Sequence, residues 1–592
     1  MSRDISGPVL DREQIFPEGA IDGLGAFNAG IKLAGDVQVG RSAFLEKHGL
    51  PSELAFKRRE MAAGRLMFHA QIGYRSLEAS KRAWAEIHDR LDARGGWAPD
   101  RYGICLDWSM GYARRDRARR RKGTGLILDK PEDFMALTAM APVAPHFGDF
   151  VLGMPAAVEN TSAALLAGAT TIGNLSQYFT FRLPDWHDDV GTTLATVEAL
   201  GLLKGQSVEI LVHSNLDDGY AAWVEDMGTA LGCAMIERWI VEDLMGLPLG
   251  QCFGHTFTDP VKRLAFKMAL ARANPTPGTM LYGNTTLYRA DIAENYAALC
   301  SYIMIDMIGQ LTAPTGHAVT PIPVTEAQRI PDVGEIVDAH MAAHRLAERL
   351  PLAMPLIDDQ AAAALVEPLE ARARSFMARA LSAFTDAGIN MEDPAELLLA
   401  MRRIGPGRLE AWYADPATEA PKIASAFVDE IEELADEELA QVPPADRQTL
   451  TETAPVVVIG ATDVHFYGKR LIETMLRRIA VEPVDGGVSV EPAKLAEACA
   501  AAGAQAVCIS TYNGVALSFV QNLKGELARR GLAIPIYVGG RLNEVLEDTG
   551  SDLPSDVAQE LRQLGAQPCS TVRDFLSDLA ARRRESPAAS RE

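Results

Sequence analysis

Three short apolar runs in the last 140 residues constrain the fold more than any other feature of the sequence. They are Pro455-Val-Val-Val-Ile-Gly460, Val507-Cys-Ile-Ser510 and Ile534-Pro-Ile-Tyr-Val538, and each is followed by small or polar residues. Apolar runs of this length, separated by stretches of helical period, indicate strands buried on both faces of a parallel sheet. The sequence therefore predicts a doubly wound α/β domain, and such sheets bind ligands at the carboxyl ends of their strands.

The most distinctive residues lie directly after these runs. They form the groups Asp463-Val-His465-Phe-Tyr-Gly468, Ser510-Thr-Tyr512 and Gly539-Gly540, with 41 residues between Gly468 and Ser510 and 26 between Tyr512 and Gly539. A histidine two residues after an aspartate can donate one ring N–H to that carboxylate while its other nitrogen binds a metal. A core or surface histidine is the commoner role for one such motif alone. A domain that binds phosphate or a nucleotide is the simplest alternative.

Together the three groups resemble the cobalamin-binding domain of B12-dependent mutases and methyltransferases, whose motifs D-x-H-x-x-G, S-x-L and G-G have the same spacing. The resemblance implies a flavodoxin-like (Rossmann-type) domain in which His465 is the lower axial ligand of cobalt and Asp463 orients it. Ser510 would meet the displaced nucleotide tail, and Gly539 and Gly540 would let that tail approach the backbone. Gly468 completes the first motif, and Tyr512 stands where the family has leucine.

Upstream, short apolar runs alternate with helical patterns between residues 61 and 330. Repeated β-then-α units predict a parallel sheet, and about eight such units fit a (β/α)8 TIM-like barrel. The predicted strands are Leu66–Gln71, Tyr102–Asp107, Phe150–Met154, Thr170–Leu175, Val208–Val212, Met235–Val241, Thr279–Tyr282 and Tyr302–Ile308. Polar residues that follow them are candidates for the active-site face: Asp107, Asn174, Ser176, Gln177, His213, Asn215, Asp217, Asn284, Thr285 and Thr286.

Parts of this upstream region resemble glutamate mutase. Residues 151–182 and 312–327 are similar, in the same order, to segments of its large subunit, and Ser510-Thr-Tyr-Asn-Gly514 is similar to its small subunit. The resemblance implies a fusion of the two subunits, with adenosylcobalamin as cofactor. In that family the 5′-deoxyadenosyl radical abstracts a substrate hydrogen, and a group then migrates to the adjacent carbon.

The departures from the family concern the substrate. Arg121 matches one of three family arginines that bind the substrate's carboxylates, Arg114 is a candidate for a second, and the third falls in a segment, His69-Ala-Gln71-Ile-Gly73, that has none. The adenosine-contacting lysine and glutamate of the family fall near Ala313 and His317. The resemblance thus implies catalytic roles for Arg121, Arg114 and His317, and a free small carboxylic acid other than glutamate as substrate.

The remaining segments complete the predicted domain plan. Residues 1–60 form an N-terminal arm without recognisable chemistry, 61–330 the catalytic barrel, 331–450 a helical connector and linker, and 451–592 the cobalamin-binding domain. The acidic run Asp429 to Glu438 is typical of a solvated helix face, and the basic run Arg114 to Lys122 of either a solvated face or an anion site.

Charge and cysteine usage narrow the class of protein. A net charge of −22 disfavours a nucleic-acid-binding protein, and seven cysteines without a C-x-x-C pair are typical of a reducing compartment. With no apolar leader and no long apolar stretch, a cytoplasmic enzyme without membrane contact is expected, and the family resemblance implies a homodimer. The favoured function is a cobalamin-dependent isomerase. The alternatives are a corrinoid-dependent methyltransferase and a cobalamin-binding sensor or carrier protein.

Overall fold

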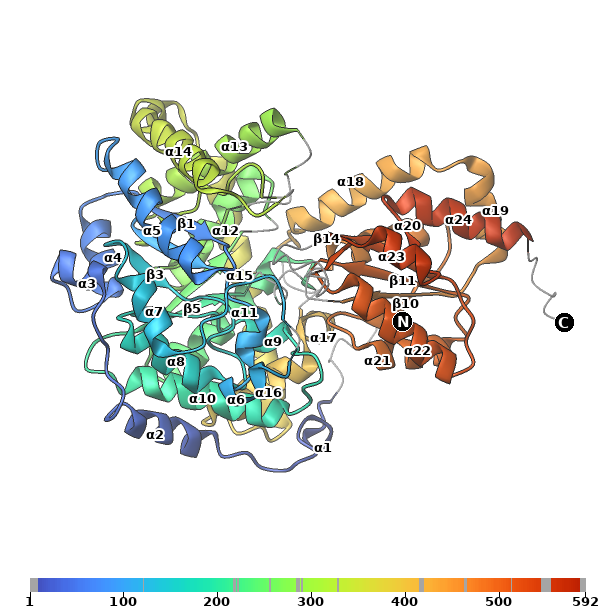
Figure 1. Ribbon diagram of the computed structural model, residues 1–592, viewed down its shortest axis with the longest axis horizontal. Coiled ribbons are helices and arrows are strands. Elements are labelled where there is room, and N and C mark those ends of the chain that lie inside the picture. Colours follow the sequence, from blue (N-terminus) through green and yellow to red (C-terminus); the bar gives the residue numbers. More distant parts are fainter. Residues whose placement is uncertain are drawn as a thin grey trace. The chain divides into compact units, whose positions relative to one another are not determined.

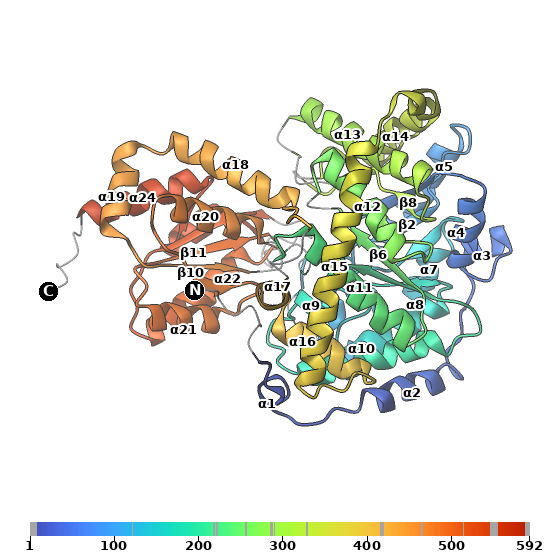
Figure 2. The same cartoon turned by 180° about the vertical axis from the view of Figure 1, so that it is seen from behind.

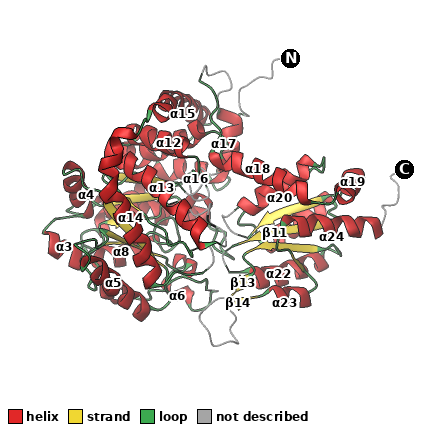
Figure 3. Ribbon diagram, turned by 90° about the horizontal axis from the view of Figure 1, so that it is seen from above, coloured by secondary structure: helices red, strands yellow, loops and turns green. Residues whose placement is uncertain are grey.

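The protein divides into two compact units, Met1–Ala426 and Phe427–Glu592, which are described separately (Figure 1). The computed structural model describes residues 9–120, 122–216, 220, 223–254, 257–283, 288, 291–326, 329–414, 420–462, 466–512, 514–544 and 555–585. Figure 3 shows that strands lie inside a cover of helices in each unit.

The N-terminal unit is built on two four-stranded parallel sheets. One has the strand order β3-β2-β1-β8 and the other β4-β5-β6-β7. A parallel bridge between Phe147 and Ile172 joins the end of β3 to β4. The strands are β1 (Met67–Ile72), β2 (Arg101–Ile104), β3 (Ala144–His146), β4 (Thr171–Ile172), β5 (Leu211–Asn215), β6 (Leu249–Phe253), β7 (Met280–Leu281) and β8 (Ala318–Val319).

These pairings confirm the predicted α/β class with parallel sheets. Among the described residues no ladder of hydrogen bonds joins β7 to β8, so the closure of the eight strands into a barrel stays a prediction.

Helices surround these strands (Figures 1 and 2). Many begin at an aspartate or serine whose side chain accepts the first free backbone N–H groups, as Asp259 does at α12, where Pro260 takes the first helical position. They are α1 (Arg12–Ile15), α2 (Gly23–Leu33), α3 (Ala43–His48), α4 (Glu53–Ala62), α5 (Leu77–Asp92), α6 (Arg114–Arg117), α7 (Pro131–Thr138), α8 (Ala157–Leu166), α9 (Gln177–Thr180), α10 (Asp189–Lys204), α11 (Met227–Arg238), α12 (Pro260–Ala273), α13 (Ile292–Thr312), α14 (Val333–Ala353), α15 (Gln360–Asp386), α16 (Pro394–Ile404) and α17 (Pro406–Tyr413).

Three predicted strands of this unit are wrong. Met235–Val241 lies in α11 and the π-helical turn after it, Tyr302–Ile308 lies inside α13, and Phe150–Met154 is a loop. Both helical runs are largely buried, and a short apolar run cannot be assigned to strand or helix by periodicity alone. The strands β3, β6 and β8 were not predicted from the sequence.

The N-terminal arm is an integral part of the first unit. Its helix α4 buries Glu53 and Lys57, and the backbone N–H of Glu53 donates to Thr170 Oγ1, directly before β4, at 2.7 Å. The Glu53 carboxylate forms ion pairs with Lys57 and with Arg101. The N-terminal arm, in which the sequence analysis recognised no chemistry, therefore supplies buried charged groups.

The C-terminal unit contains a five-stranded parallel sheet with the order β10-β9-β11-β12-β15. Numbered from the start of this unit the order is 2-1-3-4-5, which is one of the two common orders of doubly wound sheets. Its strands are β9 (Val457–Ala461), β10 (Val484–Gly487), β11 (Ala506–Thr511), β12 (Ile536–Gly540) and β15 (Gln567–Pro568), and β13 (Asn543–Glu544) with β14 (Ser555–Asp556) forms a separate antiparallel pair. The three predicted strands of this domain are confirmed as β9, β11 and β12.

Helices cover both faces of this sheet. In Figures 1 and 2, α20 and α24 lie on one face together with α18, while α21 and α22 lie on the other. The bounds are α18 (Ala426–Gln441), α19 (Pro444–Thr453), α20 (Tyr467–Arg478), α21 (Pro492–Ala502), α22 (Ala516–Arg529), α23 (Ala558–Gln563) and α24 (Val572–Glu585).

The C-terminal unit begins at Phe427, whereas the sequence analysis placed the start of this domain at residue 451. Phe427 packs its ring 5.4 Å from those of Phe466 and Tyr467. Asp446 of α19 pairs with Arg584 of α24 at 2.8 Å. The acidic helix α18 therefore belongs to the domain that follows it.

A fragment that starts at Phe427 is expected to unfold cooperatively, whereas one that starts at Ala454 is expected to show no cooperative transition. The shorter fragment loses the buried side chains of Phe427, Ile431 and Leu450. Burial of one such side chain stabilises by about 1.5–3 kcal/mol, and the loss of about 5–9 kcal/mol approaches the whole stability of a domain, roughly 5–15 kcal/mol. Thermal unfolding followed by circular dichroism tests this, and equal melting of the two fragments would contradict it.

Candidate functional site

The ends of three strands in the C-terminal unit lie side by side at one edge of the sheet. Ser510 of β11 is in register with Ala461 of β9 on one side and with Gly539 of β12 on the other, and Thr511 is in register with Gly540. The predicted cofactor residues Ser510, Gly539 and Gly540 are thus brought together. Asp463 and His465 lie outside the described residues, which resume at Phe466.

This edge is also the switch point of the sheet. Strands β9 and β11 are neighbours, but the helices that follow them, α20 and α22, lie on opposite faces (Figures 1 and 2). The chain therefore diverges above these two strand ends, where doubly wound sheets form a ligand-binding crevice. Thr462 Oγ1 and Thr511 Oγ1 meet there at 3.0 Å.

The two glycines at the end of β12 differ in their surroundings. Gly540 has a φ of +97°, and a Cβ at this position would overlap the carbonyl oxygen of Thr511. A Cβ at Gly539 would meet only the carbonyl oxygen of Cys569, at 3.7 Å. Gly540 is therefore required by the backbone, while Gly539 leaves open space beside the strand.

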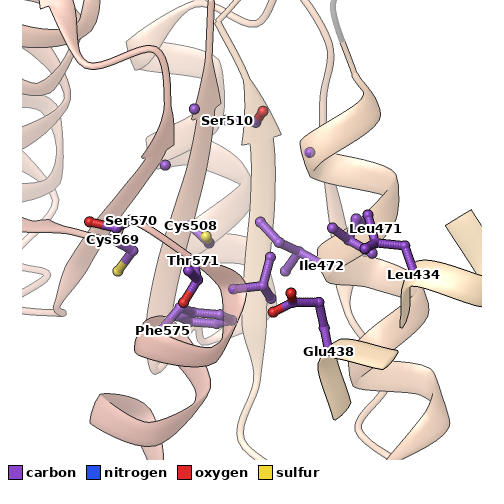
Figure 4. Close-up of a pocket in the computed structure, with 14 residues that line it drawn as sticks. Leu434, Glu438, Leu471, Ile472, Cys508, Ser510, Cys569, Ser570, Thr571 and Phe575 are labelled. Carbon is purple, nitrogen blue, oxygen red and sulfur yellow. The ribbon is translucent and has the colours of Figure 1, made fainter. Parts of the chain in front are cut away.

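A cavity of about 250 Å³ lies against this strand edge, within the C-terminal unit (Figure 4). It extends from Ser510, Gly539 and Gly540 along the sheet, between α20 and α24. Its wall is mostly apolar, with polar groups among the residues near the strand ends and the start of α24. The lining residues are Leu434, Glu438, Gly468, Leu471, Ile472, Cys508, Ser510, Gly539, Gly540, Cys569, Ser570, Thr571, Val572 and Phe575.

Two of the lining residues are cysteines that carry no charge. Burial raises the pKa of the Cys569 thiol to about 12 and raises that of Cys508 further. A thiol with so high a pKa is not a nucleophile at neutral pH, because the thiolate is the reactive form. Both side chains therefore serve as small apolar surface.

The acidic helix α18 forms one side of the cavity through Leu434 and Glu438. Glu438 Oε2 lies 2.8 Å from Arg573 Nε of α24, and Glu432 pairs with Arg478 of α20. The helix is thus held to both helices that flank the cavity, so part of the acidic run is structural.

Tyr512 and Arg541 extend the same edge. The guanidinium carbon of Arg541 lies 4.4 Å from the centre of the Tyr512 ring, a cation–π distance, and the Arg541 N–H donates to the Thr511 carbonyl at 2.8 Å. Tyr512, which stands where the resembling family has leucine, therefore takes part in a contact that leucine cannot make.

Two of the three predicted catalytic residues of the N-terminal unit lie among the described residues, Arg114 on α6 and His317 directly before β8. Arg114 is exposed on α6, and its backbone N–H donates to Glu159 Oε2 at 3.0 Å. His317 is buried directly before β8, with Nδ1 at 2.6 Å from the carbonyl oxygen of Ala318. Arg121 lies outside the described residues, as do Asp217, Asn284, Thr285 and Thr286. Within the basic run, Arg117 has a structural role, because its side chain donates to the carbonyls of Met110 and Tyr112.

The structure instead gathers three histidines that the sequence analysis did not group. They are His69 of β1, His146 of β3 and His213 of β5, and all are buried. The rings of His146 and His213 have centroids 4.5 Å apart, and those of His69 and His146 are 6.4 Å apart. Residues two positions apart on a strand lie on the same face. The pairs in His69-Ala-Gln71 and His213-Ser-Asn215 are therefore a sequence signal for a polar strand face.

The sequence matches no protein-family description and no curated protein. Among solved structures, the chain is similar over 26% of its length to 79% of a chain described as a novel cobalamin-binding protein from Desulfitobacterium hafniense DCB-2, with 17% identity and a TM-score of 0.18.

Two features are absent from the described residues. None of their helices combines the length and apolar character needed to cross a bilayer. They also contain no group of three or more histidine, cysteine, aspartate or glutamate side chains arranged to hold a metal ion.

Replacement of Gly540 by alanine is expected to destabilise the protein, by about 1–3 kcal/mol, because the new methyl group combines positive φ with overlap of the Thr511 carbonyl. Gly539→Ala is the matched control and should change the free energy of unfolding by no more than about 1 kcal/mol. Urea unfolding of both variants measures the difference. Equal stability of the two would show that the end of β12 does not have this backbone.

Proposed function

We propose that the C-terminal unit binds cobalamin and that the chain is an adenosylcobalamin-dependent mutase that rearranges the carbon skeleton of a small carboxylic acid. The observation that carries this proposal is the register of β9, β11 and β12, which aligns Ala461, Ser510 and Gly539 beside one cavity. Ser510, Gly539 and Gly540, from two of the motifs that resemble the cobalamin-binding family, thus share one strand edge, and Gly468 of the third motif lines the same cavity.

The residues at this edge fit one part of such a cofactor. Whole-ligand pockets usually have volumes of roughly 300–1,000 Å³, so a cavity of about 250 Å³ suits a segment of a larger ligand. Its apolar wall suits a flat base, while Ser510 and Thr571 offer hydroxyl groups to a ribose or phosphate. We assign the nucleotide tail to this cavity, with the bare backbone of Gly539 and Gly540 beside it.

The roles of two further residues follow from the sequence resemblance. By that resemblance His465 would hold the cobalt and Asp463 would orient its imidazole. When bound, adenosylcobalamin would supply a carbon-centred radical through homolysis of its cobalt–carbon bond. The protein's own part is to bind and orient the acid and to exclude water from the reaction.

We place the acid in the N-terminal unit, whose eight strands we propose to close into a (β/α)8 barrel. The pairing of β1 with β8, the bridge from Phe147 to Ile172 and the contact between β7 and β8 support this closure. The interior of such a barrel is screened from water by its own strands.

Cobalamin binding is expected to depend on the mouth of the cavity. Ser570 is exposed and lines the cavity, so Ser570→Trp should fill this space without disturbing the core and should weaken cobalamin binding about tenfold or more. Ser570→Ala is the matched control and should bind within about twofold of the unchanged protein. His465→Ala should separately abolish the absorption spectrum of histidine-ligated cobalamin. If Ser570→Trp binds normally, the tail does not occupy this cavity.

Radical chemistry is tested by adding small carboxylic acids to the protein reconstituted with adenosylcobalamin. A substrate should produce a paramagnetic signal in electron paramagnetic resonance, and product analysis should show an isomer of the acid. Absence of a signal with every acid, together with demethylation of methylcobalamin by a thiol, would favour the alternative function, methyl transfer. Binding without either reaction would favour a sensor or carrier.

A further inference from the structure

The strand face that His69, His146 and His213 share is unusually polar. Strand residues that share a face alternate with period two, so His69 and Gln71 of β1 face the same way as Arg101 and Gly103 of β2, with which they are in register. His146 of β3 is in register with Gly103. In barrels of parallel strands the corresponding positions usually hold Val, Ile or Leu.

Each imidazole lies against a residue that has no side chain. A Cβ at Gly103 would collide with His69 and Gln71, one at Gly148 would collide with His146, and one at Gly173 would lie 3.0 Å from His213. Three glycines thus make room for three histidines in the same interior. Glycine at three such positions leaves room beside the imidazoles. This is typical of a ligand site rather than of a packed core.

Several polar atoms in this interior have no protein partner. The Nδ1 atoms of His69 and His146 and the Nη2 atom of Arg101 are buried without a hydrogen bond in the described structure. His69 Nε2 is engaged by Gln71 Oε1 at 3.1 Å, so the free Nδ1 is its remaining polar atom. Since buried polar groups normally have partners, these atoms call for a polar ligand.

The charge beside the imidazoles is unbalanced. Glu53 Oε1 lies 3.2 Å from both Lys57 Nζ and Arg101 Nε, and all three side chains are 3% exposed. In the described part of the chain, neither cation has a second carboxylate within ion-pair distance. The nearby Asp100 is paired with Arg65. Two buried basic groups share one carboxylate, and burial lowers the pKa of both Lys57 and Arg101, so a bound anion would stabilise their charged forms.

We infer that His69, His146 and His213, with Arg101 beside His69, bind the carboxylate of a small organic acid inside the N-terminal unit. The site deepens the proposed function, on which it rests for the identity of the acid as a substrate. It differs from the arginines expected from the sequence, because it uses imidazole N–H groups backed by one guanidinium.

Binding at this site takes up a proton. Burial, followed by the positive charge of Arg101, lowers the pKa of each of the three histidines well below the ordinary value, so all are neutral in the free protein at pH 7. A carboxylate against the rings raises their pKa, and one ring then becomes protonated. Affinity therefore rises as the pH falls, by up to tenfold per pH unit between the pKa values of the free and the bound protein.

The groups that set this titration come from several elements. Each is close enough to act electrostatically on one of the three imidazoles or to touch one: Lys57 of α4, Arg101 of β2, Tyr282 after β7, His317 before β8 and His340 of α14, with Glu53 of α4 paired to the two cations.

The test uses the full-length protein without cobalamin, labelled with ¹⁵N at histidine, and succinate or acetate as probe. We expect neutral imidazole signals for the three histidines at pH 7 and a change of one of them to the protonated form when either acid is added. Calorimetry in two buffers of different ionisation enthalpy should show uptake of about one proton per bound succinate. The neutral analogue succinamide should produce neither effect.

Variants locate the effect. His146→Phe keeps an aromatic ring beside His213 but removes the ring nitrogens. It should weaken succinate binding at least tenfold, with cobalamin binding unchanged within twofold. His187→Phe, at an exposed position, is the matched control and should bind succinate normally. If His146→Phe does not fold, Gly148→Ala displaces the same ring and should weaken binding likewise.

The outcomes separate the two proposals. Succinate binding with proton uptake in a protein that fails to bind cobalamin would overturn the proposed function but keep this site. Normal cobalamin binding without any change of the histidine signals, or equal binding by His146→Phe and His187→Phe, would overturn the site and leave the cofactor proposal standing.

Discussion

The candidate cofactor site depends on the hydrogen-bonded register of three parallel strands. Because β11 pairs with β9 on one side and β12 on the other, Ser510 stands between Ala461 and Gly539 at the same height. A shift of β11 by one residue against both of its neighbours would turn the side chain of Ser510 to the opposite face. It would also remove Gly540 from the Thr511 carbonyl that only a glycine can accommodate. The cavity beside this edge is a consequence of the same register.

The N-terminal unit depends on a different balance. It buries Lys57, Arg101 and Glu53 together with three imidazoles, although burial of charge is costly unless each group is paired. The histidines lower this cost because they stay neutral in the free protein. The same neutrality lets them accept a proton when an anion arrives, so the groups that lower the cost of the buried charge also make the interior responsive to a ligand.

The two units thus offer complementary chemistry. One has a mostly apolar cavity beside a strand edge, suited to part of a large cofactor. The other has a cationic interior suited to a small acid. Helix α18, which the charge pattern predicts as a solvated face in a linker, joins the C-terminal unit because Leu434 and Glu438 line its cavity. Its acidic residues are partly used in pairs with Arg478 and Arg573.

The sequence by itself determined the strands and strand ends of the C-terminal sheet, because buried parallel strands are continuous apolar runs with abrupt polar ends. It also determined the α/β class of the whole chain. It could not separate the largely buried helix segments Met235–Val241 and Tyr302–Ile308 from strands, since a short apolar run does not reveal its period. Only the tertiary structure decided that the unit begins at Phe427 and that His69, His146 and His213 meet. The histidine contacts join residues 77 and 67 positions apart along the chain, and no local pattern records them.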